Sequence, residues 1–134
     1  MKHLLSVSDF VVCMVPYSQA THHLIGAAQI ARMKPTAILV NTARGGVVDD
    51  AALAAALKDK RIAGAGLDVF EGEPKVNPAY LGLRNVVMTP HVGSASRATR
   101  LTMCETAAAN MTAVLEGRPP AHLVNPQVEL QGKP

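Results

Sequence analysis

Tryptophan is absent from this chain, and only two phenylalanines and two tyrosines are present. A core must therefore be built from aliphatic side chains, which is possible because 49% of the residues are hydrophobic. Long apolar runs are also missing, since no stretch reaches the roughly 18 residues that a membrane span needs. The amino-terminal segment lacks the pattern of a cleaved signal peptide, so the sequence predicts a cytoplasmic protein with no membrane partner.

Charge and metal-ligand patterns are equally sparse. The net charge is only +3, and the basic residues are scattered rather than gathered in a stripe with aromatics, which argues against a nucleic-acid partner. Cys13 and Cys104 lie far apart, so they are interpreted as two reduced, buried thiols. The pair His22-His23 lacks the spacing of a metal pair, and no other set of histidines, cysteines or acids has ligand spacing. The sequence therefore predicts no metal site.

Short apolar runs alternate with helical patterns along the chain. Continuous apolar runs are typical of parallel strands that helices cover on both faces. Strands are predicted at residues 10–15, 37–41, 63–67 and 86–89. Helices are predicted at residues 26–33, at residues 50–60 after an N-cap at Asp49, and from a cap at Ser94 or Ser96 to about residue 116. This order predicts an α/β fold, and 134 residues fit one domain.

The last predicted helix has an apolar repeat along one side. Its members recur every three or four residues, which predicts one apolar face; they are Leu101, Cys104, Ala108, Met111 and Leu115. Gly117 and the prolines that follow it are expected to end the helix. Residues 118–134 are then expected to form an extended tail.

Three of the predicted strands run into ionisable side chains. Arg44 follows one strand, Asp68 and Glu73 follow the next, and His91 follows the last. Ligands of open α/β sheets bind at the carboxyl ends of the strands, which share one edge. We therefore expect these four side chains to lie close together.

The same four residue types suit the reduction of a 2-keto acid. Arg44 offers a planar, permanently charged fork for a carboxylate. His91 can protonate the new alkoxide because imidazoles titrate near neutral pH, and Glu73 beside it would stabilise the imidazolium. Asp68 can hydrogen-bond an amide or a ribose of a cofactor. Each residue alone also fits an ordinary turn or loop, but together at successive strand ends they indicate an active site.

Three motifs in order resemble the C-terminal portion of the D-isomer-specific 2-hydroxyacid dehydrogenases. They are Asn-Thr-Ala-Arg-Gly at residues 41–45, Gly-Ala-Gly-Leu-Asp-Val-Phe-Glu-Gly-Glu-Pro at residues 64–74, and Thr-Pro-His-Val-Gly at residues 89–93. Within the family, the chain is most similar to glyoxylate/hydroxypyruvate and 2-ketogluconate reductases. That finer resemblance rests on residues 21–26, 93–95 and 124–126.

The resemblance implies a role for each site residue. Arg44 would bind the substrate carboxylate and keto oxygen, His91 would be the acid in reduction and the base in oxidation, and Glu73 would pair with His91. The cofactor would be NAD or NADP. The cofactor-binding residues that the resemblance implies are Pro16, Thr42, Ala43, Arg44, Asp68, His91 and Gly93. A small 2-keto or 2-hydroxy acid is the expected substrate, and full-length members are expected to form homodimers.

The chain lacks the Gly-x-Gly-x-x-Gly fingerprint with which the family's cofactor domain begins. Residues 1–117 are therefore expected to form the C-terminal half of a Rossmann-type doubly wound parallel sheet with a long returning helix. In that fold the run at residues 10–15 becomes an exposed edge. An alternative function stays open, in which the chain is a non-catalytic interaction module that uses this edge. Neither the keto acid nor the choice of NAD or NADP follows from the sequence.

Overall fold

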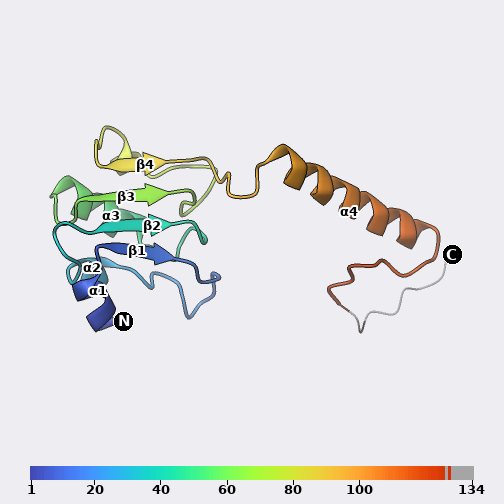
Figure 1. The fold of residues 1–134 in the computed structure, drawn as a ribbon, viewed down its shortest axis with the longest axis horizontal. Coiled ribbons are helices and arrows are strands. Elements are labelled where there is room, and N and C mark those ends of the chain that lie inside the picture. The colour runs from blue at the N-terminus through green and yellow to red at the C-terminus, as the bar shows by residue number, and fades with distance from the viewer. Residues whose placement is uncertain (126, 128–134) are drawn as a thin grey trace. The chain divides into compact units, whose positions relative to one another are not determined.

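The computed structural model describes residues 1–125 and 127. The chain forms two compact units, one over Met1–Gly93 and another that begins at Ser94. The elements are, in chain order, α1 (Lys2–Val7), β1 (Phe10–Cys13), α2 (Ala27–Ile30), β2 (Ile38–Asn41), α3 (Asp50–Lys58), β3 (Gly64–Leu67), the 3-10 turn η1 (Pro78–Tyr80), β4 (Val86–Met88) and α4 (Arg97–Leu115) (Figure 1).

The first unit contains a four-stranded parallel sheet in the order β1-β2-β3-β4. This confirms the predicted α/β fold with a parallel sheet, and each strand lies within its predicted run. β1 is an edge strand, as expected. Because all four strands point the same way, their carboxyl ends share one edge of the sheet.

The helices differ from the prediction in detail. α1 was not predicted, and α2 is shorter than the predicted residues 26–33 because the chain after it continues as tight turns. Met33 N donates to Ile30 O over 3.0 Å, a three-residue step rather than a helical four-residue step. The predicted cap of α3 is confirmed, since the Asp49 carboxylate accepts a hydrogen bond from Ala52 N at 2.9 Å.

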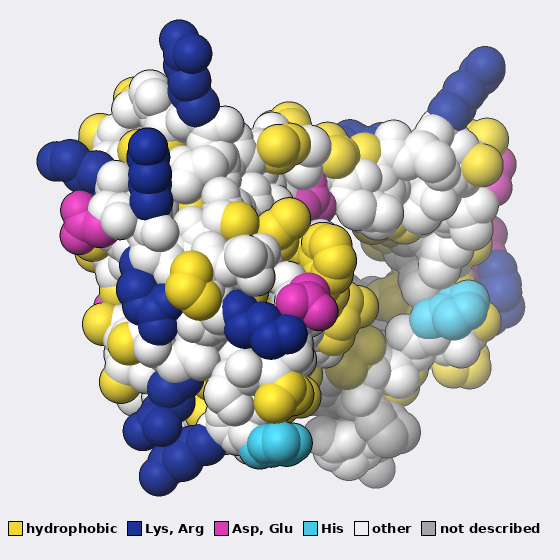
Figure 2. Space-filling view, turned by 60° about the vertical axis from the view of Figure 1, so that its left-hand side comes forward, with side chains coloured by type: hydrophobic (Ala, Val, Ile, Leu, Met, Phe, Trp, Pro, Cys, Tyr) yellow, Lys and Arg dark blue, Asp and Glu magenta, His cyan; other side chains and the backbone are white. Residues whose placement is uncertain are grey.

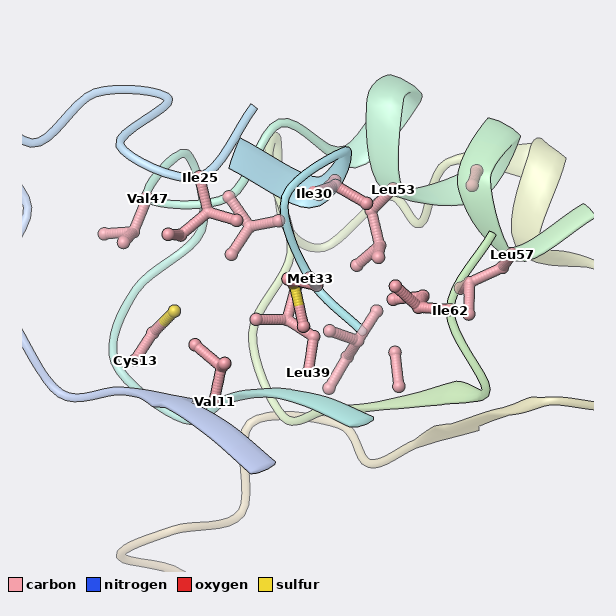
Figure 3. Packing of buried hydrophobic residues seen from close by; sticks show 14 of the residues in the cluster. Val11, Cys13, Ile25, Ile30, Met33, Leu39, Val47, Leu53, Leu57 and Ile62 are labelled. Atoms are coloured by element: carbon pink, nitrogen blue, oxygen red, sulfur yellow. The ribbon is translucent and has the colours of Figure 1, made fainter. Parts of the chain in front are cut away.

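One face of the sheet carries the core. α2 and α3 lie over this face, and their side chains point down onto those of β1 and β2 (Figure 3). Buried aliphatic and sulfur-containing side chains fill the layer between them; they include Val11, Cys13, Ile30, Met33, Leu39, Leu53, Leu57 and Ile62. Cys13 is buried as expected, and this burial raises the pKa of its thiol.

The opposite face of the sheet is open among the described residues of the first unit. Phe10 and Val12 alternate with the buried positions of β1 and are 66% and 54% exposed, and Val87 of β4 is 71% exposed. The strands are apolar on both faces, which predicts helices on both sides, but the described helices of this unit supply only one layer.

Basic side chains stand at separate places over the side of the molecule seen in Figure 2, in keeping with their scatter along the sequence.

The second unit is built around α4. Ser96 caps its start, with Oγ accepting from Thr99 N at 3.1 Å, and Gly117 follows its end with a φ of +71°. The predicted apolar positions from Leu101 to Leu115 are exposed, and Ala113 is the buried residue of the helix. The expectation that Cys104 is buried is therefore wrong, since its side chain is exposed.

The predicted tail begins with a turn near His122, whose N–H donates to Asn110 Oδ1 at 3.4 Å. Residues 126 and 128–134 of that tail lie outside the described residues. Among the described helices, none is both long enough and apolar enough to cross a membrane.

Candidate active site

A cleft of about 900 Å³ lies at the carboxyl ends of the strands. The loops after β1, β2, β3 and β4 all contribute to its wall, as expected for a ligand site in an open parallel sheet. Its lining residues are Met14, Val15, Pro16, Tyr17, Thr42, Ala43, Arg44, Gly45, Gly46, Phe70, Glu71, Gly72, Glu73 and His91. All of them belong to the first unit.

His91 and Glu73 form a hydrogen-bonded pair in this cleft. His91 Nδ1 lies 2.8 Å from Glu73 Oε2, while Glu73 Oε1 accepts from Phe70 N at 2.8 Å. The bond from His91 is the main cause that lowers the pKa of Glu73, and partial burial of the carboxylate opposes it. The histidine is thus held against a carboxylate that is itself fixed to the backbone.

The backbone at His91 adopts a left-handed conformation, with a φ of +52°. Such a conformation is uncommon for a residue with a side chain, and outliers of this kind cluster at functional sites. Its N–H donates to Asp68 O at 2.9 Å, which holds the turn against the end of β3.

The loop after β2 presents Arg44 to the same cleft. Asn41 is buried and shapes this loop: its Oδ1 accepts from Ala43 N, and its Nδ2 donates to Arg44 O, both over 3.2 Å. Gly45 sits directly against Phe70, since an added Cβ would lie 1.8 Å from the Phe70 carbonyl oxygen. Arg44 itself is exposed, so its guanidinium is accessible to an anion.

Asp68 ties the end of β3 to the loop that carries His91. One carboxylate oxygen accepts from the Thr89 hydroxyl and from Val92 N at 2.9 Å, and the other accepts from Gly93 N at 3.0 Å. The Thr89 hydroxyl is the main cause that lowers the pKa of Asp68, and the two backbone donors add to it. These bonds make Asp68 a positioning residue for the loop after β4.

The predicted site residues divide into two groups. Pro16, Thr42, Ala43, Arg44, Glu73 and His91 line the cleft, whereas Asp68 and Gly93, which are hydrogen-bonded to each other, are absent from its wall. A contact of Asp68 or Gly93 with a cofactor stays a prediction.

Sequence reasoning missed two residues that shape the site, Asn41 and Asp50. In the sequence, Asn41 is the first residue of the motif at residues 41–45 and has no further signal of its own. Asp50 is buried beside the predicted cap, and its carboxylate accepts from Glu71 N at 3.0 Å and from the Tyr80 hydroxyl at 3.1 Å. An aspartate in the first turn of a helix is ordinarily explained by its favourable interaction with the helix dipole, so the sequence held no signal for this contact.

Comparison with known proteins agrees with this geometry. Residues 1–93 match the family model described as D-isomer specific 2-hydroxyacid dehydrogenase, NAD binding domain. The chain is 51% identical over 134 residues to a glyoxylate reductase of Thermococcus gammatolerans, covering 100% of this chain and 40% of that protein. It is 53% identical over 126 residues to a glyoxylate/hydroxypyruvate reductase B of Enterobacter agglomerans, covering 93% of this chain and 39% of that protein.

Solved structures show the same likeness. The TT0316 protein of Thermus thermophilus superposes with a TM-score of 0.84 at 45% identity, covering 92% of this chain and 40% of that one. An NADPH-dependent glyoxylate/hydroxypyruvate reductase of Sinorhizobium meliloti, solved with NADP and malonate, superposes with a TM-score of 0.78 at 39% identity. The match covers 85% of this chain and 36% of that one. The chain thus spans about 40% of the length of the curated relatives that it matches.

Proposed function

The chain belongs to the D-isomer-specific 2-hydroxyacid dehydrogenase family, and we propose that it supplies the acid-base end of an NAD(P)-dependent enzyme that interconverts a small 2-keto acid and a D-2-hydroxy acid. The observation that carries the proposal is the His91–Glu73 pair, which lines one cleft together with Arg44. The names of the relatives favour glyoxylate or hydroxypyruvate as the substrate class. A 2-ketogluconate-type substrate rests on the sequence resemblance alone.

The proposed reaction divides its work among three side chains. Arg44 binds the substrate carboxylate through its charged fork and draws electron density toward the keto oxygen. His91 gives a proton to that oxygen as the keto carbon is reduced, and takes it back in oxidation. Because Nδ1 of His91 is bonded to Glu73, the proton moves through Nε2. The Glu73 carboxylate stabilises the ring while it is protonated.

The cofactor, when bound, supplies or accepts the hydride. The cleft suits the nicotinamide end, because Val15 and Pro16 offer an apolar wall and the segment at residues 42–46 offers backbone polar groups beside glycines. The chain has no Gly-x-Gly-x-x-Gly loop for the pyrophosphate. We therefore assign only the nicotinamide half of the cofactor to this chain, as NAD or NADP.

The remaining parts of the proposal concern assembly and location. Homodimer formation and a cytoplasmic location stay predictions from the sequence. The interaction-module alternative gains no support from the relatives, which carry the names of reductases. The presence of Arg44, Glu73 and His91 together favours a catalytic function over the interaction module.

The test is a chimera in which this chain replaces the matching C-terminal 40% of the Thermococcus gammatolerans glyoxylate reductase. We expect the chimera to reduce glyoxylate, and His91→Ala to lower kcat by at least about 10²-fold, the usual worth of general acid catalysis. Glu73→Gln should also slow reduction, because the protonated ring loses its carboxylate.

His122→Ala is the matched control, since His122 lies outside the cleft and should leave turnover unchanged. Turnover of the His91→Ala chimera within about twofold of the parent chimera would remove His91 from the role of acid.

A further inference from the structure

A second group of ligand-type side chains meets at the rim of the cleft. One ring nitrogen each of His22 and His23 and one carboxylate oxygen of Glu71 all lie within 4.8 Å of one another. The two imidazoles stack with centroids 3.9 Å apart and planes 23° apart. Glu71 is 48 positions away from His23 in the sequence, so only the fold brings the group together.

The backbones that carry these ligands are held in place by other bonds. His23 has a φ of +48°, and its N–H donates to Gly46 O at 2.7 Å. Ile25 N donates to Val47 O at 3.1 Å, so the segment after His23 is also tied to the loop after β2. On the other side, Glu71 N donates to the buried carboxylate of Asp50 at 3.0 Å. The backbones of the ligands are therefore fixed before any ion arrives, and the two stacked imidazole rings turn so that both lone pairs meet the ion.

Each imidazole has a polar group near at least one of its nitrogens. His23 Nε2 lies 3.0 Å from Glu71 Oε1, while its Nδ1 lies 3.8 Å from Asp49 Oδ2. His22 Nδ1 lies 3.3 Å from the Tyr17 hydroxyl, which leaves its Nε2 to bind an ion. Histidines that bind metals usually donate their other N–H to a carboxylate or a similar acceptor, which fixes the ring and raises its basicity. Asp49 is the carboxylate beside His23 Nδ1, at 3.8 Å, which is an ion-pair distance rather than a hydrogen bond.

We propose that His22, His23 and Glu71 bind a divalent ion of the zinc class at the rim of the cleft. Two imidazoles and one carboxylate are a ligand set that Zn²⁺ and Co²⁺ accept, whereas Mg²⁺ and Ca²⁺ prefer oxygen ligands throughout. Three protein ligands leave one coordination position for water or an anion. The ion replaces the hydrogen bond between His23 Nε2 and Glu71, so the Nε2 lone pair must be free; a neutral His23 meets this by carrying its proton on Nδ1, which faces Asp49.

This site is independent of the proposed reduction, and its sequence signal was weak. Adjacent histidines lack ligand spacing, which is why the sequence predicted no metal site. The alternative is that His23 and Glu71 only clasp two loops together. A hydrogen bond between His23 and Glu71 that only joins two loops needs neither His22 nor Asp49. Substitutions at His22 and Asp49 therefore distinguish a metal site from such a bond.

The probe is Co²⁺, titrated into the 134-residue chain while its visible absorption is followed and then displaced with Zn²⁺. The measurement is made on the His3→Gln variant, because the chain amine together with a nearby histidine is itself a chelator. We expect one bound ion per chain with the absorption of four-coordinate cobalt. His22→Gln, His23→Gln and Glu71→Gln should each weaken binding by at least about tenfold, and His122→Gln should leave it unchanged.

Asp49→Asn is the sharper variant. Asparagine caps a helix as well as aspartate does, so α3 keeps its start while the partner of His23 loses its charge. We expect this change to weaken Co²⁺ binding by about 10- to 100-fold, the usual effect of losing an outer-sphere carboxylate. Far-ultraviolet circular dichroism checks that every variant is folded.

Two results would overturn the site: no visible absorption at millimolar Co²⁺, or equal affinity in the three ligand variants and the parent. Because no substrate or nicotinamide cofactor is present in the assay, loss of the metal site and loss of the proposed reductase function remain distinguishable.

Discussion

Gly45 illustrates how a single residue sets the shape of the cleft. An added Cβ would lie 1.8 Å from the Phe70 carbonyl oxygen and 2.3 Å from its carbon, and both are backbone atoms that no rotamer change can move. Gly45→Ala should therefore push the loops after β2 and β3 apart and destabilise the chain by about 1–3 kcal/mol, as other forced overpacking does.

Denaturant unfolding measures this change, and Gly66→Ala is the control. An added Cβ at Gly66 would meet the Val40 side chain at an ordinary 3.8 Å. Equal stability of the two variants would contradict the close approach of Gly45 to Phe70.

Asp68 makes the stability of the first unit depend on acid. Its pKa is lowered in the folded chain, mainly by the Thr89 hydroxyl, so the folded state binds this proton less tightly than the unfolded state. Asp68 therefore contributes stability above the ordinary aspartate pKa of about 3.9. That contribution is lost as the pH falls through the lowered pKa.

Asp68→Asn should accordingly lower the melting temperature at pH 7 and flatten its fall in acid, because one backbone donor then faces an amide N–H₂. Thermal melts between about pH 7 and pH 2, a range that brackets the ordinary aspartate pKa, give both quantities. Asp59→Asn, at the exposed end of α3, should leave the melting temperature at pH 7 unchanged. A parallel downward shift of the Asp68→Asn curve at every pH would contradict the assignment.

At the scale of elements, α3 and η1 are joined through a buried carboxylate. Asp50, in the first turn of α3, accepts from the Tyr80 hydroxyl of η1 and from Glu71 N. Burial raises the pKa of Asp50, so its charged form depends on these two donors. This contact also sets the position of the loop that leads to Glu73.

Tyr80→Phe should destabilise the chain by about 1–3 kcal/mol, because a buried carboxylate loses a donor that water does not replace. Thermal unfolding measures the loss. Tyr17→Phe is the matched control, since Tyr17 is exposed and, within residues 1–125 and 127, its hydroxyl bonds only to the exposed His22. If both variants melted at the same temperature, the bond from Tyr80 to Asp50 would not matter for stability.

At the scale of the whole molecule, the two faces of the sheet carry different roles. Leu39 is fully buried under α2 and α3, whereas Val12 on the other face is 54% exposed. Leu39→Ala should cost about 2–5 kcal/mol, the range for truncating a buried leucine. Val12→Lys should change stability by no more than about 0.5 kcal/mol.

The same Val12→Lys change should reduce self-association of the 134-residue chain, because an exposed apolar edge strand favours pairing between copies. Sedimentation velocity over a range of concentrations measures this. Unfolding of the Val12→Lys variant would show that this face is covered rather than open.

Local patterns were sufficient to predict the parallel sheet, the cap at Asp49, and the meeting of Arg44, Glu73 and His91; they left the cap of α4 open between Ser94 and Ser96, and the structure places it at Ser96. An apolar run predicts a strand from adjacent residues alone, and parallel strands bring their carboxyl ends to one edge whatever the loops between them do. Polar residues that directly follow a strand therefore lie at the edge of the sheet where the cleft is.

Only the tertiary structure decided the rest. The approach of Glu71 to His23, the bond from Tyr80 to Asp50 and the exposure of Cys104 depend on the paths of loops and on which layers cover each element. Those paths are set by packing and backbone bonds between residues tens of positions apart. No local periodicity encodes them, because each partner has an ordinary explanation within its own segment.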